Sequence, residues 1–254
     1  MAEQWFIWLV IAWISLGVVS FIALLFIDVP YGKQYGTKTR AWGPGIPNQL
    51  GWFIMEAVVL VSFFGTFATM NASWSSPTLL FAALLTIHYV NRALIYPWRT
   101  RTRGKKIPLS MFLMSTVFNT MNGFLLGWEF ALYADRDVSW FADPRFNVGM
   151  LLFICGMVLN MHSDNVLINL RKGGDTGYYV PHGGGFRYVS SPNLLGEITE
   201  WAGFALLTWT WSGLAFFVWT AANLVPRARA NHRWYRDEFP DYPTNRKALI
   251  PGIW

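Results

Sequence analysis

Long apolar stretches separated by short polar segments dominate this sequence. Most hold about 20 residues, the length that an α-helix needs to cross roughly 30 Å of hydrocarbon. Five such stretches are residues 5–27, 49–70, 79–96, 111–132 and 146–167. A further stretch from Leu194 to Val225 is too long for one span, and Ser212-Gly213 offers a turn near its middle. The pattern predicts an all-α, polytopic membrane protein with seven transmembrane helices.

The distribution of Lys and Arg predicts the orientation of these helices. The segments after the first, third and fifth stretches and the C-terminal tail hold 17 of the 20 basic residues. The other connections hold only Arg136 and Arg145, and Arg92 lies inside the third stretch. Short cytoplasmic loops collect positive charge, so we expect the N-terminus outside and the C-terminus in the cytoplasm. The predicted cytoplasmic segments are loops 28–48, 97–110 and 168–193 and the tail 227–254.

Composition agrees with a membrane protein, because 54% of the residues are hydrophobic and only 13% are charged. The net charge of +6 follows from the topology, so it gives no reason to expect nucleic-acid binding. With no basic segment before it, the first stretch is interpreted as an uncleaved anchor. The single cysteine, Cys155, excludes an intrachain disulfide and is predicted to be a buried structural thiol. No repeat or linker interrupts the chain, which is predicted to form one membrane domain, residues 1–254.

Strongly polar side chains within the predicted spans are costly, so each is a functional candidate. They gather toward the cytoplasmic ends of several helices: Glu56, His88, Tyr89, Asn91, Arg92, Asn160, His162, Asp164, Asn193, Glu197 and Glu200. Asn160 and Asp164 are four residues apart, as are Asn193 and Glu197, so each pair projects from one helical face. The pattern predicts a polar pocket open to the cytoplasm. No second His or Cys stands at metal-ligand spacing, so no metal site is predicted.

The chain has no Gly-x-Gly-x-x-Gly motif after a strand and no Walker sequence, which excludes a soluble nucleotide-binding fold. The basic residues on the cytoplasmic side nevertheless suit a multiply phosphorylated ligand such as NADPH, because guanidinium groups bind phosphate bidentately. Positive charge on cytoplasmic loops explains the same residues equally well, so both interpretations stay open.

Several motifs occur together at collinear spacing. They are Asn160-Met161-His162-Ser163-Asp164, Arg171-Lys172, Tyr178, Pro181, Asn193-Leu194-Leu195-Gly196-Glu197, Glu200-Trp201, Asp241-Tyr242-Pro243 and Arg246-Lys247-Ala248-Leu249-Ile250-Pro251. This set resembles the steroid 5-alpha-reductase (3-oxo-5-alpha-steroid 4-dehydrogenase) family, and a bacterial homologue is expected. The resemblance extends more thinly to Trp52, Glu56, His88-Tyr89 and Asn122-Gly123, and so covers most of the chain from about residue 50.

The resemblance implies NADPH-dependent reduction of the Δ4 double bond of 3-oxo steroids, with hydride transfer to carbon 5 and protonation at carbon 4. Glu56 and Tyr89 resemble the catalytic pair that binds the 3-oxo group. The residues that resemble the apolar walls of the substrate site are Trp52, Phe118 and Trp201. Those that resemble cofactor contacts are Arg103, Lys105, Asn160, Asp164, Arg171, Tyr178, Asn193, Glu197, Arg227, Asn231 and Tyr235.

The chain departs from the family's pattern at Met55, Met114, Asn223 and Asn231, which leaves its preference for steroids open. Alternatives are a related membrane reductase of a polyprenol or an enoyl thioester, a membrane S-adenosylmethionine-dependent methyltransferase, and a non-enzymatic lipid-binding or transport protein. We expect a monomer with a small lipid substrate and membrane lipids as partners. The expected location is the bacterial inner membrane for a bacterial source and the endoplasmic reticulum for a eukaryotic one.

Overall fold

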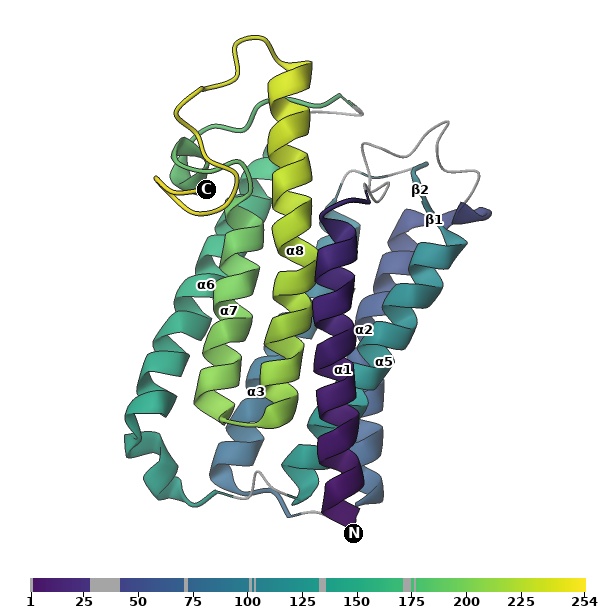
Figure 1. Ribbon diagram of the computed structural model, residues 1–254, viewed down its shortest axis with the longest axis vertical. Helices are drawn as coiled ribbons and strands as arrows, with labels where there is room; N and C mark the ends of the chain where they lie inside the picture. The colour runs from purple at the N-terminus through teal and green to yellow at the C-terminus, as the bar shows by residue number, and fades with distance from the viewer. Residues whose placement is uncertain are drawn as a thin grey trace. The chain divides into compact units, whose positions relative to one another are not determined.

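The computed structural model describes residues 2–27, 42–70, 73–100, 102, 104–132, 136–170, 175 and 177–254. The chain divides into two compact units. Unit 1 comprises residues 1–28 and 144–254, and unit 2 comprises residues 29–143. Long helices form most of each unit (Figure 1).

Unit 1 contains α1 (Ala2–Leu24), α6 (Pro144–Asn169), α7 (Pro192–Thr208) and α8 (Trp211–Glu238), with a short 3-10 turn, η5 (Gly184–Arg187). Helix α1 packs along α8, and the two run in the same direction (Figure 1). The indole N–H of Trp219 donates to the carbonyl of Trp13 at 2.8 Å, and the centroids of the two rings are 4.7 Å apart. A large aromatic pair therefore anchors the N-terminal helix.

Helices α6 and α7 approach each other closely along a line of glycines. A Cβ atom at Gly149 would lie 2.5 Å from the amide nitrogen of Leu207, and one at Gly196 would lie 2.5 Å from that of Asn160. Gly156 on α6 and Gly203 on α7 meet the opposite backbone in the same way. Small residues let helix backbones approach closely without a hydrophobic side chain between them. Backbone contact therefore fixes the pairing of these two helices.

The break between α7 and α8 lies three residues before the predicted turn. Trp209 ends α7 in a left-handed conformation with φ of 48°, and the hydroxyl of Thr210 caps α8 by accepting from the amide of Gly213 at 3.1 Å. The prediction of a turn at Ser212-Gly213 is therefore wrong by this margin, since both residues belong to the first turn of α8. The N-cap residue Thr210 therefore marks the start of the new helix. Glycine fits in its first turn because a Cβ at Gly213 would lie only 2.9 Å from the capping hydroxyl oxygen.

Helix α8 continues to Glu238, although the predicted span ended near Val225. Pro226 lies inside the helix, where a proline removes one backbone hydrogen bond. Leu224 and Ala228, on either side of this proline, are buried with Leu194 of α7 and Leu249 of the C-terminal segment. Packing on this small core holds the helix together past the proline, so the first part of the tail is helical.

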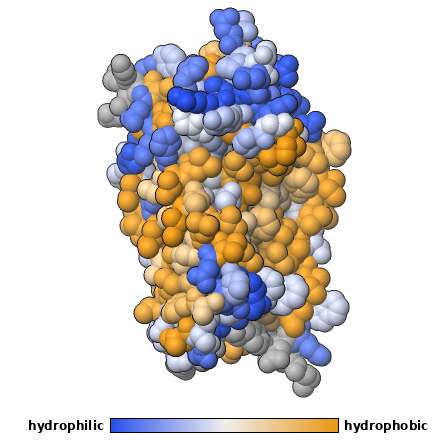
Figure 2. All heavy atoms as spheres, turned by 90° about the vertical axis from the view of Figure 1, so that its left-hand side faces the viewer, coloured by the Kyte–Doolittle hydropathy of each residue, from blue (hydrophilic) through white to orange (hydrophobic). Residues whose placement is uncertain are grey.

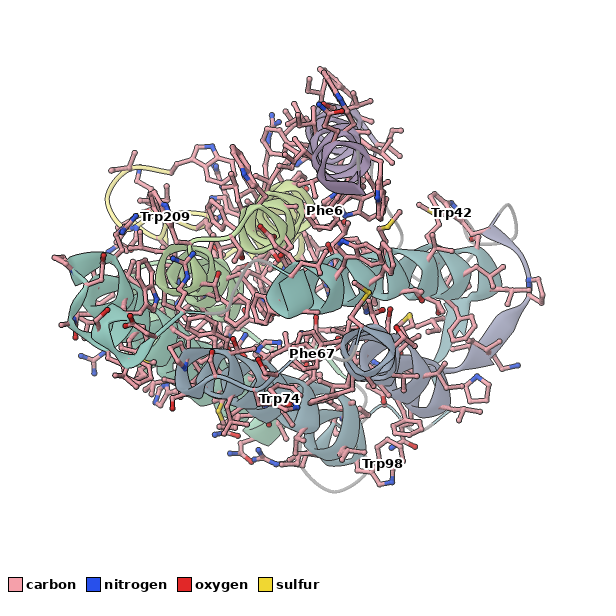
Figure 3. All side chains as sticks on the ribbon, turned by 90° about the horizontal axis from the view of Figure 1, so that it is seen from below. Phe6, Trp42, Phe67, Trp74, Trp98 and Trp209 are labelled. Atoms are coloured by element: carbon pink, nitrogen blue, oxygen red, sulfur yellow. The ribbon has the colours of Figure 1, made fainter. Side chains whose placement is uncertain are left out.

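Unit 2 contains α2 (Asn48–Thr69), α3 (Ser76–Tyr89), the π-helix η3 (Val90–Ile95), α4 (Tyr96–Arg99), α5 (Leu109–Leu132) and a 3-10 turn, η4 (Val138–Ala142). Ser75 caps α3 by accepting from the amide of Thr78. Phe67 near the end of α2 stacks on Trp74 before α3, with ring centroids 4.0 Å apart (Figure 3). The cap and the stacked pair fix the turn from α2 into α3.

Helices α2 and α5 pack through three positions of α5 that are four residues apart. Asn119 donates its amide to the carbonyl of Met55 at 2.6 Å. A Cβ at Gly123 would lie 2.5 Å from the carbonyl of Val59, and one at Gly127 would lie 2.5 Å from that of Phe63. This is the small-residue spacing that brings membrane helices together. These contacts fix the backbone of α2 at Met55, the residue before the predicted catalytic residue Glu56.

Two short strands, β1 (Gly45–Pro47) and β2 (Lys106–Pro108), form an antiparallel pair that the sequence pattern did not predict. Each strand has three residues and ends in proline, too short for an alternating pattern to be visible. Helix α2 begins directly after β1, and α5 begins directly after β2. The strand pair therefore holds the first residues of these two helices at the same end of unit 2.

Five helices in the described part of the chain are long and apolar enough to cross a membrane: Gln4–Leu24, Asn48–Thr69, Ser76–Arg99, Leu109–Leu132 and Pro144–Asn169. On the face shown in Figure 2, hydrophobic residues cover much of the middle and hydrophilic residues gather toward the top. Cys155 is exposed on α6, so the prediction of a buried thiol is wrong. Its neighbour Gly156, and not Cys155, occupies the face that packs against α7.

Candidate active site

Four of the predicted cofactor residues form one hydrogen-bonded network between α6 and α7. The side-chain amide of Asn160 donates to the carbonyl of Asn193 at 2.9 Å and lies 3.5 Å from the carboxylate of Glu197. The side-chain amide of Asn193 donates to the carboxylate of Asp164 at 3.1 Å. Asn160 and Asp164 are buried, whereas Asn193 and Glu197 are partly accessible. The two pairs predicted from sequence spacing therefore meet in space.

The glycine contacts explain why this network forms. A Cβ at Gly196 would lie 2.5 Å from the amide nitrogen of Asn160, so the two helices are nearly in backbone contact at the network. Asn has a short side chain, and Asn160 reaches the carbonyl of Asn193 only because the backbones are this close. Any larger residue at Gly196 would separate the donor from its acceptor.

The amide and carboxylate groups of this network suit a nucleotide cofactor. Amide and carboxylate groups hydrogen-bond sugar hydroxyls and a carboxamide, and arginine binds phosphate. Ser163, one residue before Asp164, has 0% exposure, and its hydroxyl has no hydrogen-bond partner among the described residues. Arg227, which is partly accessible, supplies positive charge on α8 of the same unit. Both polar hydrogen-bonding groups and a phosphate-binding side chain are therefore available in unit 1.

Three further predicted cofactor residues, Tyr178, Asn231 and Tyr235, belong to the C-terminal half of α8 or contact it. Asn231 donates to the hydroxyl of Ser191, one residue before α7, at 3.4 Å. The ring of Tyr178 contacts Trp234 with centroids 5.5 Å apart, and Tyr235 is buried. Arg171 lies outside the described residues.

A cluster that the sequence reasoning missed lies next to these residues. The hydroxyl of Ser190 is 2.6 Å from Nδ1 of His232 and 2.7 Å from the hydroxyl of Tyr242. Burial lowers the pKa of His232 below its usual value, and the positive charges of Arg236, Lys247 and Arg246 lower it further. The Asp241-Tyr242-Pro243 motif could have pointed to this cluster, but the sequence does not show that Tyr242 contacts Ser190.

The predicted catalytic pair lies in unit 2. Glu56 is partly accessible on α2, and Tyr89, only 3% exposed, is the last residue of α3 before the π-helix. Helix α2 packs against η3, the element that follows Tyr89 directly. The amide of Tyr96 bonds the carbonyl of Asn91, five residues back, and Pro97 has no N–H to offer. Proline therefore accounts for a π-helix beside the predicted catalytic tyrosine.

Trp52, predicted to line the substrate site, lies beside a buried arginine. The guanidinium carbon of Arg92, a residue 9% exposed on η3, is 5.6 Å from the ring centroid of Trp52 and 4.9 Å from that of Tyr96. Aromatic faces stabilise a cation that is removed from water. The indole N–H of Trp52 is buried and has no acceptor among the described residues. This end of α2 is therefore both aromatic and polar.

The remaining predicted residues are distributed between the two units. Phe118, a partly accessible residue on α5, accepts through its carbonyl from Asn122 at 3.0 Å. Trp201 belongs to α7 in unit 1, where its ring stacks on Phe216 with centroids 4.1 Å apart. Lys105 immediately precedes β2, and its carbonyl accepts from the amide of Asn48. Arg103 lies outside the described residues, and the roles of all four stay predictions.

Metal ligands do not gather in the described part of the chain, where no group of three His, Cys, Asp or Glu residues is placed to hold an ion. His162 is exposed on α6, and Gly184 passes over its ring, because a Cβ there would lie 2.5 Å from Cε1. His88 is buried in α3, with its ring against that of Tyr89.

Comparison with known proteins identifies the family. A sequence model described as 3-oxo-5-alpha-steroid 4-dehydrogenase matches residues 105–254. The 3-oxo-5-alpha-steroid 4-dehydrogenase 1 of Bos taurus is 40% identical over 243 residues, which cover 94% of this chain and 93% of the relative. The chain belongs to the 3-oxo-5-alpha-steroid 4-dehydrogenase family. The family includes the steroid 5-alpha-reductase DET2 of Gossypium hirsutum, 39% identical over 245 residues and 92% of each chain.

Family membership confirms the resemblance found in the motifs. It makes the chain an oxidoreductase and removes the support for a methyltransferase or a non-enzymatic lipid carrier. The 3-oxo-5-alpha-steroid 4-dehydrogenase 1 of Homo sapiens, 41% identical over 214 residues, covers 82% of this chain. The likeness therefore spans both units and not only unit 1.

Proposed function

We propose that this protein reduces the Δ4 double bond of 3-oxo steroids to give 5α-reduced 3-oxosteroids, with NADPH as the reductant. The observation that carries the proposal is 40% identity over 94% of the chain with an enzyme named for this chemistry. The α6–α7 network of amides and carboxylates supports it, because its groups suit a nucleotide. One NADPH and one proton are consumed for each double bond reduced.

In this proposal, Glu56 and Tyr89 bind the carbonyl oxygen of the substrate. NADPH, when bound, supplies the hydride that reaches carbon 5. Negative charge then develops on the 3-oxo oxygen, and hydrogen-bond donors fixed there stabilise it. The hydroxyl of Tyr89 and the protonated carboxyl of Glu56 each donate a hydrogen bond to this oxygen and keep their protons, and carbon 4 is protonated through water. Burial of Tyr89 at the end of α3 keeps water from competing for that oxygen.

The chain's own residues hold the two ligands in different ways. Trp52, Phe118 and Trp201 are proposed to supply apolar surface to the steroid. The cofactor set is Arg103, Lys105, Asn160, Asp164, Arg171, Tyr178, Asn193, Glu197, Arg227, Asn231 and Tyr235. Its arginine and lysine residues bind phosphate groups, and its amides and carboxylates orient the rest of the nucleotide.

The proposed topology has seven transmembrane helices in one membrane domain, with the N-terminus outside and the C-terminus in the cytoplasm. The five apolar spans, α7 and the first half of α8 supply the seven helices. Helices α1 and α8 run in the same direction, as an odd number of spans requires of the first and last (Figure 1). We propose a monomer in the bacterial inner membrane, or in the endoplasmic reticulum if the source is eukaryotic.

Substrate trials with detergent-solubilised protein test the proposal. NADPH oxidation is followed at 340 nm with testosterone, progesterone and androstenedione, and the configuration at carbon 5 of the product is determined. We expect consumption of NADPH and a 5α product. Consumption only with a polyprenol or an enoyl thioester would contradict the steroid assignment, and the absence of NADPH binding would contradict the cofactor assignment.

A further inference from the structure

A polar cluster outside the proposed catalytic and cofactor sets ties the C-terminal segment to the start of α7, and its members Ser190 and Tyr242 are buried while His232 is partly accessible. Ser190 is at its centre, 2.6 Å from Nδ1 of His232 and 2.7 Å from the hydroxyl of Tyr242, and it donates to the carbonyl of Lys247 at 3.1 Å. Ser190 precedes α7, His232 belongs to α8, and the other two residues belong to the C-terminal segment. The cluster therefore joins the start of α7 to residues of α8 and of the C-terminal segment that lie 42 and 52 positions after Ser190.

Backbone contacts reinforce this connection. The amide of Ser190 donates to the carbonyl of Lys247 at 2.7 Å, and the amide of Lys247 donates to the carbonyl of Tyr188 at 2.9 Å. Arg246 is 3% exposed, and its guanidinium lies 4.9 Å from the ring centroid of Tyr242. The C-terminal segment is thus held on this loop by side-chain and backbone bonds together.

Two proposed cofactor residues are direct neighbours of the cluster, and a third, Asn193, follows Ser190 by three positions. Tyr235 stacks on Tyr242 with centroids 5.3 Å apart and planes 9° from parallel. Asn231 precedes His232 and donates to Ser191, which lies two residues before Asn193. A shift of the C-terminal segment would therefore move Tyr235, Asn231 and Asn193 together.

We propose that Ser190, His232 and Tyr242 are positioning residues that hold the C-terminal segment against the start of α7 and so set the affinity for NADPH. These three residues are called the latch below. The inference rests on the proposed function, because it concerns the same cofactor. Removing one member of a buried hydrogen-bonded set leaves another unsatisfied, so the latch weakens sharply when any one is lost. The effect falls on cofactor binding, since Tyr242 stacks on Tyr235 and Asn231 bonds Ser191, the residue after Ser190.

Variants of His232 and Tyr242 test the latch. Tyr242→Phe keeps the ring that stacks on Tyr235 and removes only the hydroxyl. His232→Leu removes the ring nitrogens, whereas His232→Asn keeps a polar group near the place of Nδ1. We expect NADPH binding about tenfold weaker in Tyr242→Phe and His232→Leu, the scale of one buried hydrogen bond, with largely restored binding in His232→Asn.

Two measurements separate positioning from general damage. The KM for the steroid stays within about twofold of the wild-type value while binding of NADPH weakens, because these variants change no residue that is proposed to bind the steroid. Hydrogen exchange of the Ser190 and Lys247 amides accelerates in the same variants, a readout that does not need turnover. Tyr188→Phe removes a hydroxyl and His182→Gln removes an imidazole from exposed side chains of the same loop, and both variants leave the two measurements unchanged.

Wild-type NADPH affinity in both Tyr242→Phe and His232→Leu would overturn the latch. Faster amide exchange without weaker NADPH binding would also overturn it. So would an equal rise in the Kd for NADPH and the KM for the steroid. A wild-type protein that binds no NADPH would refute the proposed function and this role with it. Normal wild-type turnover with unaltered variants would refute the latch alone.

Discussion

Glu56 is the residue on which the proposed chemistry depends most. The preceding residue, Met55, has its carbonyl held by the amide of Asn119 at 2.6 Å, so the backbone at this point of α2 is fixed from α5. A donor aimed at developing charge is effective only when its position is set before the reaction. We expect Glu56→Gln to lower kcat by about 10²- to 10³-fold, and Glu56→Ala to lower it further.

The same variants distinguish substrate chemistry from cofactor binding. Affinity for NADPH is expected to be unchanged, because Glu56 is not among the residues proposed to bind the cofactor. Glu238→Gln, which neutralises an exposed carboxylate at the end of α8, serves as the control with full activity. Full turnover by Glu56→Ala would remove Glu56 from the mechanism.

His232 makes the stability of the latch depend on pH. Its pKa in the folded protein is lowered from about 6.5, first by burial and then by Arg236 on α8 and by Lys247 and Arg246 in the C-terminal segment. The unfolded chain therefore binds the proton more readily, so stability is complete above about pH 6.5 and falls as the pH drops toward the folded pKa.

Thermal unfolding of the wild type and of His232→Asn between pH 5 and 8 measures this effect. We expect the difference between the two proteins to be constant above about pH 6.5 and to shrink at lower pH, where the histidine loses its stabilising contribution. A difference that grows on acidification would show that protonation strengthens the cluster, contrary to the direction of the pKa shift.

At the scale of elements, the glycine line between α6 and α7 gives a direct prediction. A Cβ at Gly156 would lie 2.6 Å from the carbonyl of Gly196 and would also meet the backbone of Glu200. Backbone atoms cannot move aside as a flexible side chain can, so Gly156→Ala is expected to destabilise the protein by about 1–3 kcal/mol. NADPH affinity should fall too, since the network of Asn160 lies one turn away.

Gly65→Ala is the matched control for this substitution. Gly65 also lies within a helix, but a Cβ there meets nothing within 4 Å. Alanine is the better helix former, so this variant should be unchanged or more stable by up to about 1 kcal/mol. Chemical or thermal unfolding compares the two variants, and equal stability would show that α6 and α7 are not in backbone contact.

Sequence patterning predicted elements well wherever length and hydropathy decide them. All five single apolar stretches are helices whose ends lie within a few residues of the predicted ones. It failed where a tertiary contact decides: the break at Thr210, the continuation past Pro226, the π-helix before Pro97 and the strands β1 and β2. Each depends on a cap, a missing N–H or a partner segment that hydropathy does not record.

The candidate site shows the same division between local and distant information. Asn160 and Asp164 were predicted as a pair from their spacing, and their meeting with Asn193 follows from facing glycines on α6 and α7. Ser190 was not predicted, because its partners His232 and Tyr242 are 42 and 52 residues away. Spacing predicts contacts within one helix but not which loop a distant segment covers.

For the whole molecule, the decisive prediction is topological. Seven spans place residues 136–143 outside and residue 187 in the cytoplasm, as the basic loops indicate. In a Cys155→Ala background, Val138→Cys and Arg187→Cys each provide one exposed thiol. In intact cells, or oriented vesicles with the outside face exposed, an impermeant maleimide should label position 138 at once and position 187 only after permeabilisation. Labelling of both positions, or the reverse order, would contradict the orientation and the cytoplasmic entry of NADPH that depends on it.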